Sequence, residues 1–297
     1  MTPRVSVIMT VRNGARFLPE TLDALSRQTF ADYELVVNDN GSTDDTLAIL
    51  ADYAGRDHRI RVLPPSPQRD PTFTQGIQRA LEAATAPLVA VNDSDDVPTL
   101  DRLEKLVVWL DADPRVAIAA SWFDNIDEQG RHLATNRVPD ALVDAYQTGN
   151  PVAHSSIMYR RDLAVAAGAY REQFTFASDF ALAVAMLSAG GKVAIVPEPL
   201  IKIRLHGQQA SLMPGKRAQY YWEPLDILRT ASRLQGVSRP ARLRGMVARQ
   251  KLALRYAWAL WREGRRAAGI VGAIYWLFVS LTSLWARPAA YRSGGMA

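Results

Sequence analysis

The sequence predicts an α/β fold in which helices flank a mostly parallel sheet. Short apolar segments alternate with segments whose apolar residues recur at helical spacing, and acidic residues follow apolar segments where strands are expected to end. With 48% hydrophobic and 22% charged residues, the 297-residue chain has the composition of a globular protein. It is long enough to bury the core of one large domain with an extension.

The first part of the chain repeats strand, loop and helix. Strands are expected over residues 5–11, 33–38, 59–64 and 88–92, and helices within residues 13–28, 41–54 and 74–86. Ser42 or Thr43 is the expected N-cap of the second helix. Strands that alternate with helices form parallel βαβ units, whose ligands bind beyond the carboxyl ends of the strands.

Residues 88–96, LVAVNDSDD, end an apolar strand in a group of carboxylates. Asp93, Asp95 and Asp96 would repel one another by several kcal/mol if they were desolvated, so they either lie in water or hold a cation. A solvated turn before a helix is the simpler alternative. Asp39 ends the second strand and is expected at the same edge of the sheet.

The pattern changes from about residue 115. A strand is expected over 115–127, a polar excursion over 130–150, a short strand and helix within 155–170, a helix over 178–191, and a strand interrupted by prolines over 192–206. Asp179 lies in the first turn of the expected helix over 178–191.

Charge and cysteine content narrow the class of protein. The chain has no cysteine, which excludes disulfides and thiolate metal sites. Its N-terminus does not resemble a signal peptide, so a cytoplasmic location is expected. The net charge of +5 is uneven, because residues 239–297 contain 11 Lys/Arg and one acidic residue whereas residues 1–238 contain 24 and 29.

The basic tail suits an anionic membrane surface. Residues 267–286 contain no formal charge and would span about 30 Å as a helix. We expect a helix in the membrane interface, with a single span and a soluble packed helix as alternatives. Arginines among aromatic residues favour anionic lipid over nucleic acid, because no nucleic-acid-binding module accompanies them.

Four segments, in order, resemble the family 2 inverting glycosyltransferases of the GT-A fold. Residues 5–46 resemble the opening of that family, from the first strand to an Asp followed by Gly-Ser-Thr-Asp. VNDSDD stands where the family has its metal-binding DxD, FASDFALAVAM where an acidic helix start supplies the base, and IRLHGQQAS resembles a late Arg-x-His element. The resemblance implies a Rossmann-like GT-A domain over residues 1–215 and a helical, basic and apolar extension over 216–297, associated with the membrane.

The resemblance also implies an activity. It indicates metal-dependent, inverting transfer of one sugar from a UDP- or dTDP-linked donor to a glycan or polyprenyl-linked acceptor, in the synthesis of cell-surface polysaccharide. Mg²⁺ or Mn²⁺ would neutralise the departing diphosphate. The processive enzymes' Gln-x-x-Arg-Trp element is not found, which favours the addition of one sugar at a time. The location implied is the inner face of the cell membrane.

The site residues follow from the same resemblance. The donor would be bound by Thr10, Val11, Arg12, Asp39, Asp93, Ser94 and Arg204, and the metal by Asp93, Asp95 and His206. Asp39 would accept a hydrogen bond from a pyrimidine N3–H, or else only complete its own turn. Asp179 would be the general base, or else a carboxylate that complements a helix dipole. Arg204 and His206 could instead be structural, and His154 could lie on the acceptor side.

Some positions depart from the family pattern. The departures are Asn38, Asn40, Gln78, Ala80, Asn92 and Ser178. They leave a non-catalytic nucleotide-sugar-binding protein as an alternative. A sugar nucleotidyltransferase is a further alternative, but it would need a glycine-rich basic loop after the first strand, where this chain has VRNGARF.

Overall fold

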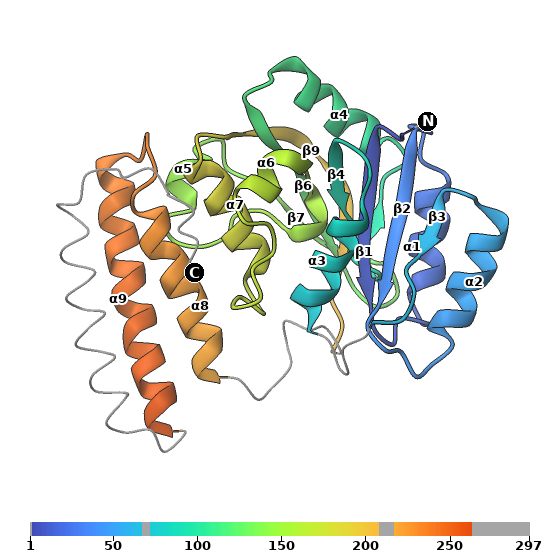
Figure 1. Ribbon diagram of the computed structural model, residues 1–297. Helices are drawn as coiled ribbons and strands as arrows, with labels where there is room; N and C mark the ends of the chain where they lie inside the picture. Colours follow the sequence, from blue (N-terminus) through green and yellow to red (C-terminus); the bar gives the residue numbers. More distant parts are fainter. Residues whose placement is uncertain (1, 67–71, 208–216, 263–297) are drawn as a thin grey trace, which may run out of the picture. The chain divides into compact units, whose positions relative to one another are not determined.

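The computed structural model describes residues 2–66, 72–207 and 217–262 (Figure 1). The chain divides into two compact units, each described here by itself. The sheet unit comprises Met1–Val138, Val152–Thr175 and Gly191–Gly207, and the helical unit comprises Pro139–Pro151, Phe176–Gly190 and Gln208–Ala297. The helical unit includes two segments that precede residue 215 in the sequence. The expected domain boundary at residue 215 remains a prediction.

The sheet unit contains nine strands and the helices between them. The strands are β1 (Val5–Val11), β2 (Tyr33–Asp39), β3 (Ile60–Val62), β4 (Leu88–Val91), β5 (Val97–Pro98), β6 (Val116–Ile126), β7 (His132–Asn136), β8 (Ile157–Arg160) and β9 (Lys192–Arg204). The helices are α1 (Leu18–Ser26), α2 (Thr46–Arg56), α3 (Phe73–Ala83), α4 (Arg102–Ala112), α6 (Arg161–Ala166) and the 3₁₀ turn η1 (His154–Ser156).

The strands form one sheet in the order β3-β2-β1-β4-β8-β6-β9-β5, and β7 pairs with β6. β3, β2, β1 and β4 are parallel to one another, β8 is antiparallel to both its neighbours, and β6 is parallel to β9. Helices lie between successive strands of the parallel part (Figure 1). The predicted α/β fold class is confirmed.

The parallel part is covered on both faces. Every residue of β1 is buried, as expected of a strand inside a doubly covered sheet. Val5, Val7 and Met9 belong to one core with side chains of α1, α2 and α4. Thr10 faces the other way, where Gly76 of α3 lies against it. Each fully buried aliphatic side chain of this core contributes about 1.5–3 kcal/mol to folding.

The helical unit contains α5 (Leu142–Ala145), α7 (Ser178–Ser188), α8 (Arg217–Ala231) and α9 (Arg239–Arg262). α8 contacts both α7 and α9, and α5 contacts α9. α7 is apolar on nearly all sides and eight of its eleven residues are buried. α7 is therefore a buried helix.

Three local expectations were wrong. α2 begins at Thr46, not after Ser42 or Thr43, because Ser42 bonds to Asp39 and the Thr46 N–H instead donates to Asp44 Oδ1 at 3.1 Å. Residues 130–150 include β7, an exposed strand without an apolar pattern that pairs with β6. The last strand, β9, continues through its prolines, because its pairing with β6 shifts register at this point.

Candidate active site

The carboxyl ends of β1, β2 and β4 lie side by side in the sheet. Val11 is opposite Asp39 in the pairing of β1 with β2, and Ile8 is opposite Val91 in the pairing with β4. The N–H of Asn92 extends this pattern by donating to the Ile8 carbonyl at 3.1 Å. The predicted meeting of Asp39 and the acidic group at one edge is confirmed.

The loops after β1 and β2 are hydrogen-bonded into one structure. Asn13 has a φ of 53°, and its Oδ1 accepts from the Thr43 N–H at 2.8 Å. The N–H groups of Asn13 and Gly14 donate to the hydroxyls of Ser42 and Thr46, both at 2.9 Å. The Asn-Gly turn and the Gly-Ser-Thr segment therefore hold each other in place.

Asp39 completes the turn that follows β2. Its Oδ2 accepts from the N–H groups of Gly41 at 2.9 Å and Ser42 at 3.0 Å, and its Oδ1 accepts from the Ser42 hydroxyl. Each carboxylate oxygen has two lone pairs, so Oδ1 can accept one further hydrogen bond. The turn and the predicted contact with a pyrimidine are therefore compatible.

The other residues predicted at the donor lie on the same edge. Thr10 and Val11 are buried at the end of β1, and Arg12 is exposed. Thr10 Oγ1 is buried without a hydrogen-bond partner among the residues that the structure describes. Ser94 is half-buried, and its carbonyl accepts from the Thr21 hydroxyl of α1 at 3.0 Å.

The acidic loop after β4 contains carboxylates in very different surroundings. Asp96 is 3% exposed, and its Oδ1 accepts from the Arg204 N–H at 3.1 Å. Burial, followed by the charges of Asp95 and Asp93, raises the pKa of Asp96 well above its usual range. Burial and then Asp93 also raise the pKa of Asp95, although His206 Nε2 lies 2.8 Å from Asp95 Oδ2 and opposes the rise.

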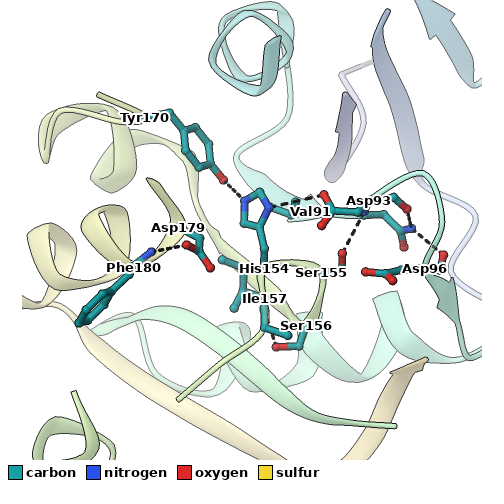
Figure 2. A network of polar contacts seen from close by, with 12 residues as sticks. Val91, Asp93, Asp96, His154, Ser155, Ser156, Ile157, Tyr170, Asp179 and Phe180 are labelled. Atoms are coloured by element: carbon teal, nitrogen blue, oxygen red, sulfur yellow. Dashed lines mark hydrogen bonds and ion pairs between the residues drawn. The ribbon is translucent and has the colours of Figure 1, made fainter. Parts of the chain in front are cut away.

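Asp93 lies beside the 3₁₀ turn η1, as Figure 2 shows. Its N–H donates to Ser155 Oγ at 3.0 Å, and its Oδ1 is 3.6 Å from His154 Nδ1. The other ring nitrogen, His154 Nε2, is 2.9 Å from the Tyr170 hydroxyl. His154, which the sequence left without a definite role, is therefore a neighbour of the DxD carboxylates.

The donor atoms of this loop fit a divalent cation. Within the part of the chain that the structure describes, no three His, Asp or Glu side chains are grouped as a ready metal site. However, Asp93 Oδ1 is buried without a hydrogen-bond partner among the described residues, and the side chains available are two carboxylates and an imidazole. Carboxylate oxygens are the ligands that Mg²⁺ and Mn²⁺ prefer. Asp93, Asp95 and His206 are the residues that would hold the ion.

Arg204 has many partners within the protein. It is 1% exposed, its Nη1 donates to the carbonyls of Asp127 and Glu128, both at 3.2 Å, and its Nη2 is 2.6 Å from Glu20 Oε2. Its guanidinium also lies over the Phe17 ring at 4.8 Å. These contacts match the alternative in which Arg204 has a structural role. Its contact with the donor remains a prediction.

A buried arginine that the sequence did not single out lies beneath the acidic loop. Arg102 in α4 is fully buried, and its Nη2 donates to the carbonyls of Val91 at 2.8 Å and Ser155 at 2.7 Å. Burial lowers the pKa of Arg102 to about 10, and the charges of Asp96 and Asp93 oppose that change. Arg102 thus joins the end of β4 to η1 and places a positive charge near the carboxylates.

Asp179 lies in the first turn of α7, as predicted, within the helical unit. Its Oδ1 accepts from the Phe180 N–H at 2.7 Å (Figure 2), and its Oδ2 accepts from Asn150 Nδ2 at 2.8 Å. The sequence did not indicate Asn150. An Asn 29 residues before an Asp carries no local signal, so only the folded chain brings the two together.

The sequence profile of glycosyl transferase family 2 matches residues 6–165, more than half of the chain. The chain belongs to this family. An uncharacterized glycosyltransferase of Haemophilus influenzae is 27% identical over 228 residues, which cover 70% of this chain and 68% of the relative. The amylovoran biosynthesis glycosyltransferase AmsE of Erwinia amylovora is 26% identical over 204 residues, which cover 67% and 75%.

Solved structures show the same fold for this family 2 glycosyltransferase. S. aureus TarS in complex with UDP-GlcNAc has a TM-score of 0.65 at 15% identity, covering 97% of this chain and 93% of that chain. The mannosyltransferase PcManGT of Pyrobaculum calidifontis, in complex with GDP-Man and Mn²⁺, has a TM-score of 0.57 at 19% identity, covering 96% and 88%. The predicted GT-A fold is confirmed, and the chain is a glycosyltransferase.

No helix among residues 2–66, 72–207 and 217–262 is both long enough and apolar enough to cross a membrane. The predicted interfacial or spanning segment, residues 267–286, lies outside the described residues. Its relation to a membrane remains a prediction.

Proposed function

We propose that this glycosyltransferase transfers one sugar, with inversion and with the help of a divalent cation, from a UDP- or dTDP-linked donor to a hydroxyl of a glycan or lipid-linked acceptor. The observation that carries the proposal is the acidic loop after β4. There Asp93 Oδ1 is buried and has no hydrogen-bond partner within residues 2–66, 72–207 and 217–262, and it lies next to Asp95 and its neighbour His206. A buried excess of negative charge is stabilised by a cation.

The residues of the sheet unit have separate tasks in this proposal. Asp39, at the end of β2, accepts the N3–H of the pyrimidine through the free lone pair of its Oδ1. Asp93, Asp95 and His206 would hold Mg²⁺ or Mn²⁺. The bound ion supplies Lewis-acid stabilisation of the departing diphosphate. Mn²⁺ in the PcManGT complex and UDP-GlcNAc in the TarS complex support these assignments.

Asp179 takes the proton from the acceptor hydroxyl. Its carboxylate oxygens accept hydrogen bonds from the Phe180 N–H and from Asn150 Nδ2, which orient the carboxylate. A positioned carboxylate of this kind contributes as a general base during attack on the anomeric carbon.

The acceptor class and location are inferred from a relative and from α9. AmsE acts in amylovoran biosynthesis, which supports a role in cell-surface polysaccharide synthesis. Leu243, Val247, Leu254 and Trp258 of α9 are exposed and lie within about 60° of one another around the helix. Arg244, Lys251, Arg255 and Arg262 are exposed along one edge of this stripe. Such a helix suits an anionic membrane surface at the cytoplasmic face, and co-sedimentation with anionic vesicles tests this.

The decisive experiment compares the full chain with its Asp179→Asn variant. UDP- and dTDP-sugars are offered with Mn²⁺ and lipid-linked acceptors, and both diphosphate release and the anomeric configuration of the product are measured. We expect inversion, and a loss in kcat of at least about 100-fold in the variant with unchanged affinity for UDP. An equal loss of UDP affinity would instead assign Asp179 to the donor site.

A further inference from the structure

A buried glutamate of α8 caps the helix that carries Asp179. Glu223 is fully buried, and its Oε2 accepts from the N–H groups of Phe176 at 2.8 Å and Ala177 at 3.0 Å. Ala177 is the N-cap of α7 and provides no side-chain cap of its own. The first N–H groups of a helix need acceptors, and a carboxylate there also complements the helix dipole. Glu223 therefore holds the N-cap of α7, which lies two residues before Asp179.

A second contact fixes the carboxylate of Asp179 itself. Asn150 Nδ2 donates to Asp179 Oδ2 at 2.8 Å, while the Phe180 N–H holds Oδ1 at 2.7 Å. With both oxygens held, the side chain keeps one rotamer. The Phe180 ring is in turn stacked on the buried ring of Tyr146, with their centroids 5.8 Å apart.

The segment that carries Asn150 is anchored to the C-terminal helices. Gln147 Nε2 donates to the Ala231 carbonyl at the end of α8 at 2.6 Å. A Cβ added at Gly245 of α9 would lie 2.9 Å from the Gln147 carbonyl, so glycine is needed for this close approach. α8 and α9 thus support both residues that contact the Asp179 region.

We propose that Asn150 and Glu223 are positioning residues for the catalytic base. Glu223 sets the start of α7, and Asn150 orients the Asp179 carboxylate. The helix α8, which follows the part of the chain that resembles the family, is then a component of the catalytic apparatus. This inference rests on the proposed role of Asp179 as the general base.

The principal test is Asn150→Asp in the full chain, with the pH dependence of kcat/KM as the measurement. A second carboxylate within hydrogen-bond distance of Asp179 disfavours the ionised form of the base and raises its pKa. The acidic limb of the profile should therefore move up by about one pH unit or more. Tyr146, at the end of α5, is close enough for the Asp179 charge to raise its pKa, and Glu223 of α8 caps the helix that carries Asp179; both are unchanged in the variant.

Two further variants separate positioning from loss of structure. Asn150→Ala should lower kcat about 10-fold, because a hydrogen bond to a charged group is lost, while KM for the donor and the affinity for UDP stay the same. Glu223→Gln keeps the shape but loses the charge, and should also lower kcat without changing the affinity for UDP. Ser238→Ala is the control, because Ser238 bonds to Asp144 at the start of α9 in the same unit.

The outcomes distinguish the two proposals. If Asp179→Asn retains activity, the role of Asp179 as the base is wrong. If Asp179→Asn is inactive but Asn150→Asp leaves the pH profile unmoved, the positioning role is overturned. It is also overturned if Ser238→Ala, at a comparable loss of Tm, lowers kcat as much as Asn150→Ala.

Discussion

The turn after β2 and the loop after β4 both place aspartates at the same edge of the sheet, yet the two regions treat their carboxylates differently. Asp39 receives hydrogen bonds from the Gly41 and Ser42 N–H groups and from the Ser42 hydroxyl, all within four residues. Asp93 Oδ1 is buried, and no described residue forms a hydrogen bond with it. The Asp39 carboxylate is therefore hydrogen-bonded by its own turn, whereas this oxygen of the acidic loop is not.

The turn after β2 is therefore a preformed surface, whereas the loop after β4 is a site of concentrated negative charge. A carboxylate that accepts several hydrogen bonds from its own turn is held in one orientation before any ligand arrives. In the acidic loop, burial and then Asp93 raise the pKa of Asp95, and burial and then both of these carboxylates raise the pKa of Asp96, so a positive charge from outside would stabilise the loop. We therefore expect the turn to recognise a base and the loop to depend on a metal ion.

Asp95→Asn tests the dependence of the acidic loop on metal and should have the largest effect. It should reduce sugar transfer by at least about 100-fold, because it weakens the ion that stabilises the leaving diphosphate. Titration calorimetry should show that Mn²⁺ no longer strengthens UDP binding, while circular dichroism shows an intact fold. Full activity of this variant in buffer treated with EDTA would end the metal-dependent interpretation.

Asp39→Asn tests whether the turn also recognises the pyrimidine of the nucleotide donor. The side-chain oxygen of Asn can still accept from the Gly41 and Ser42 N–H groups, but its NH₂ replaces an acceptor by a donor. The affinity for UDP should fall about 10-fold and that for CDP less, since cytosine has an acceptor at N3. If UDP and CDP lose affinity equally in calorimetry, Asp39 serves the turn alone.

Ser42→Ala should have the smallest effect and mainly lower stability. It removes the hydroxyl that donates to Asp39 and accepts from the Asn13 N–H. A cost of about 1 kcal/mol is expected, or roughly 2–4 °C in Tm by calorimetry. Ser26→Ala is the control, because the Ser26 hydroxyl donates to the Asp23 carbonyl within α1, away from this turn. An equal loss of Tm in both variants would contradict a special role for the turn.

The parts of the fold that depend on local sequence were predicted well. Apolar runs located β1, β2 and β4, and the parallel arrangement they imply correctly brought Asp39 and the acidic loop to one edge. The position of Asp179 in the first turn of a helix was also confirmed. These features follow from periodicity and from residues that are close in sequence.

Long-range contacts were not predictable in this way. Arg102 and Glu223 are charged residues in helices, where a single sequence indicates solvent exposure, yet both are fully buried. Each bonds to backbone groups of distant segments, and contacts with backbone groups cannot be inferred from the residue types. β7 was missed for a related reason, since its pairing with β6 needs no apolar side chains.

The Arg204 side chain ties together segments that are far apart in the sequence. It bonds to Glu20 of α1, to the Asp95 carbonyl and to the carbonyls of Asp127 and Glu128. None of these segments can move away without leaving buried N–H groups of one guanidinium without acceptors. In native-state hydrogen exchange, their amides should therefore become accessible together, as one cooperative opening unit.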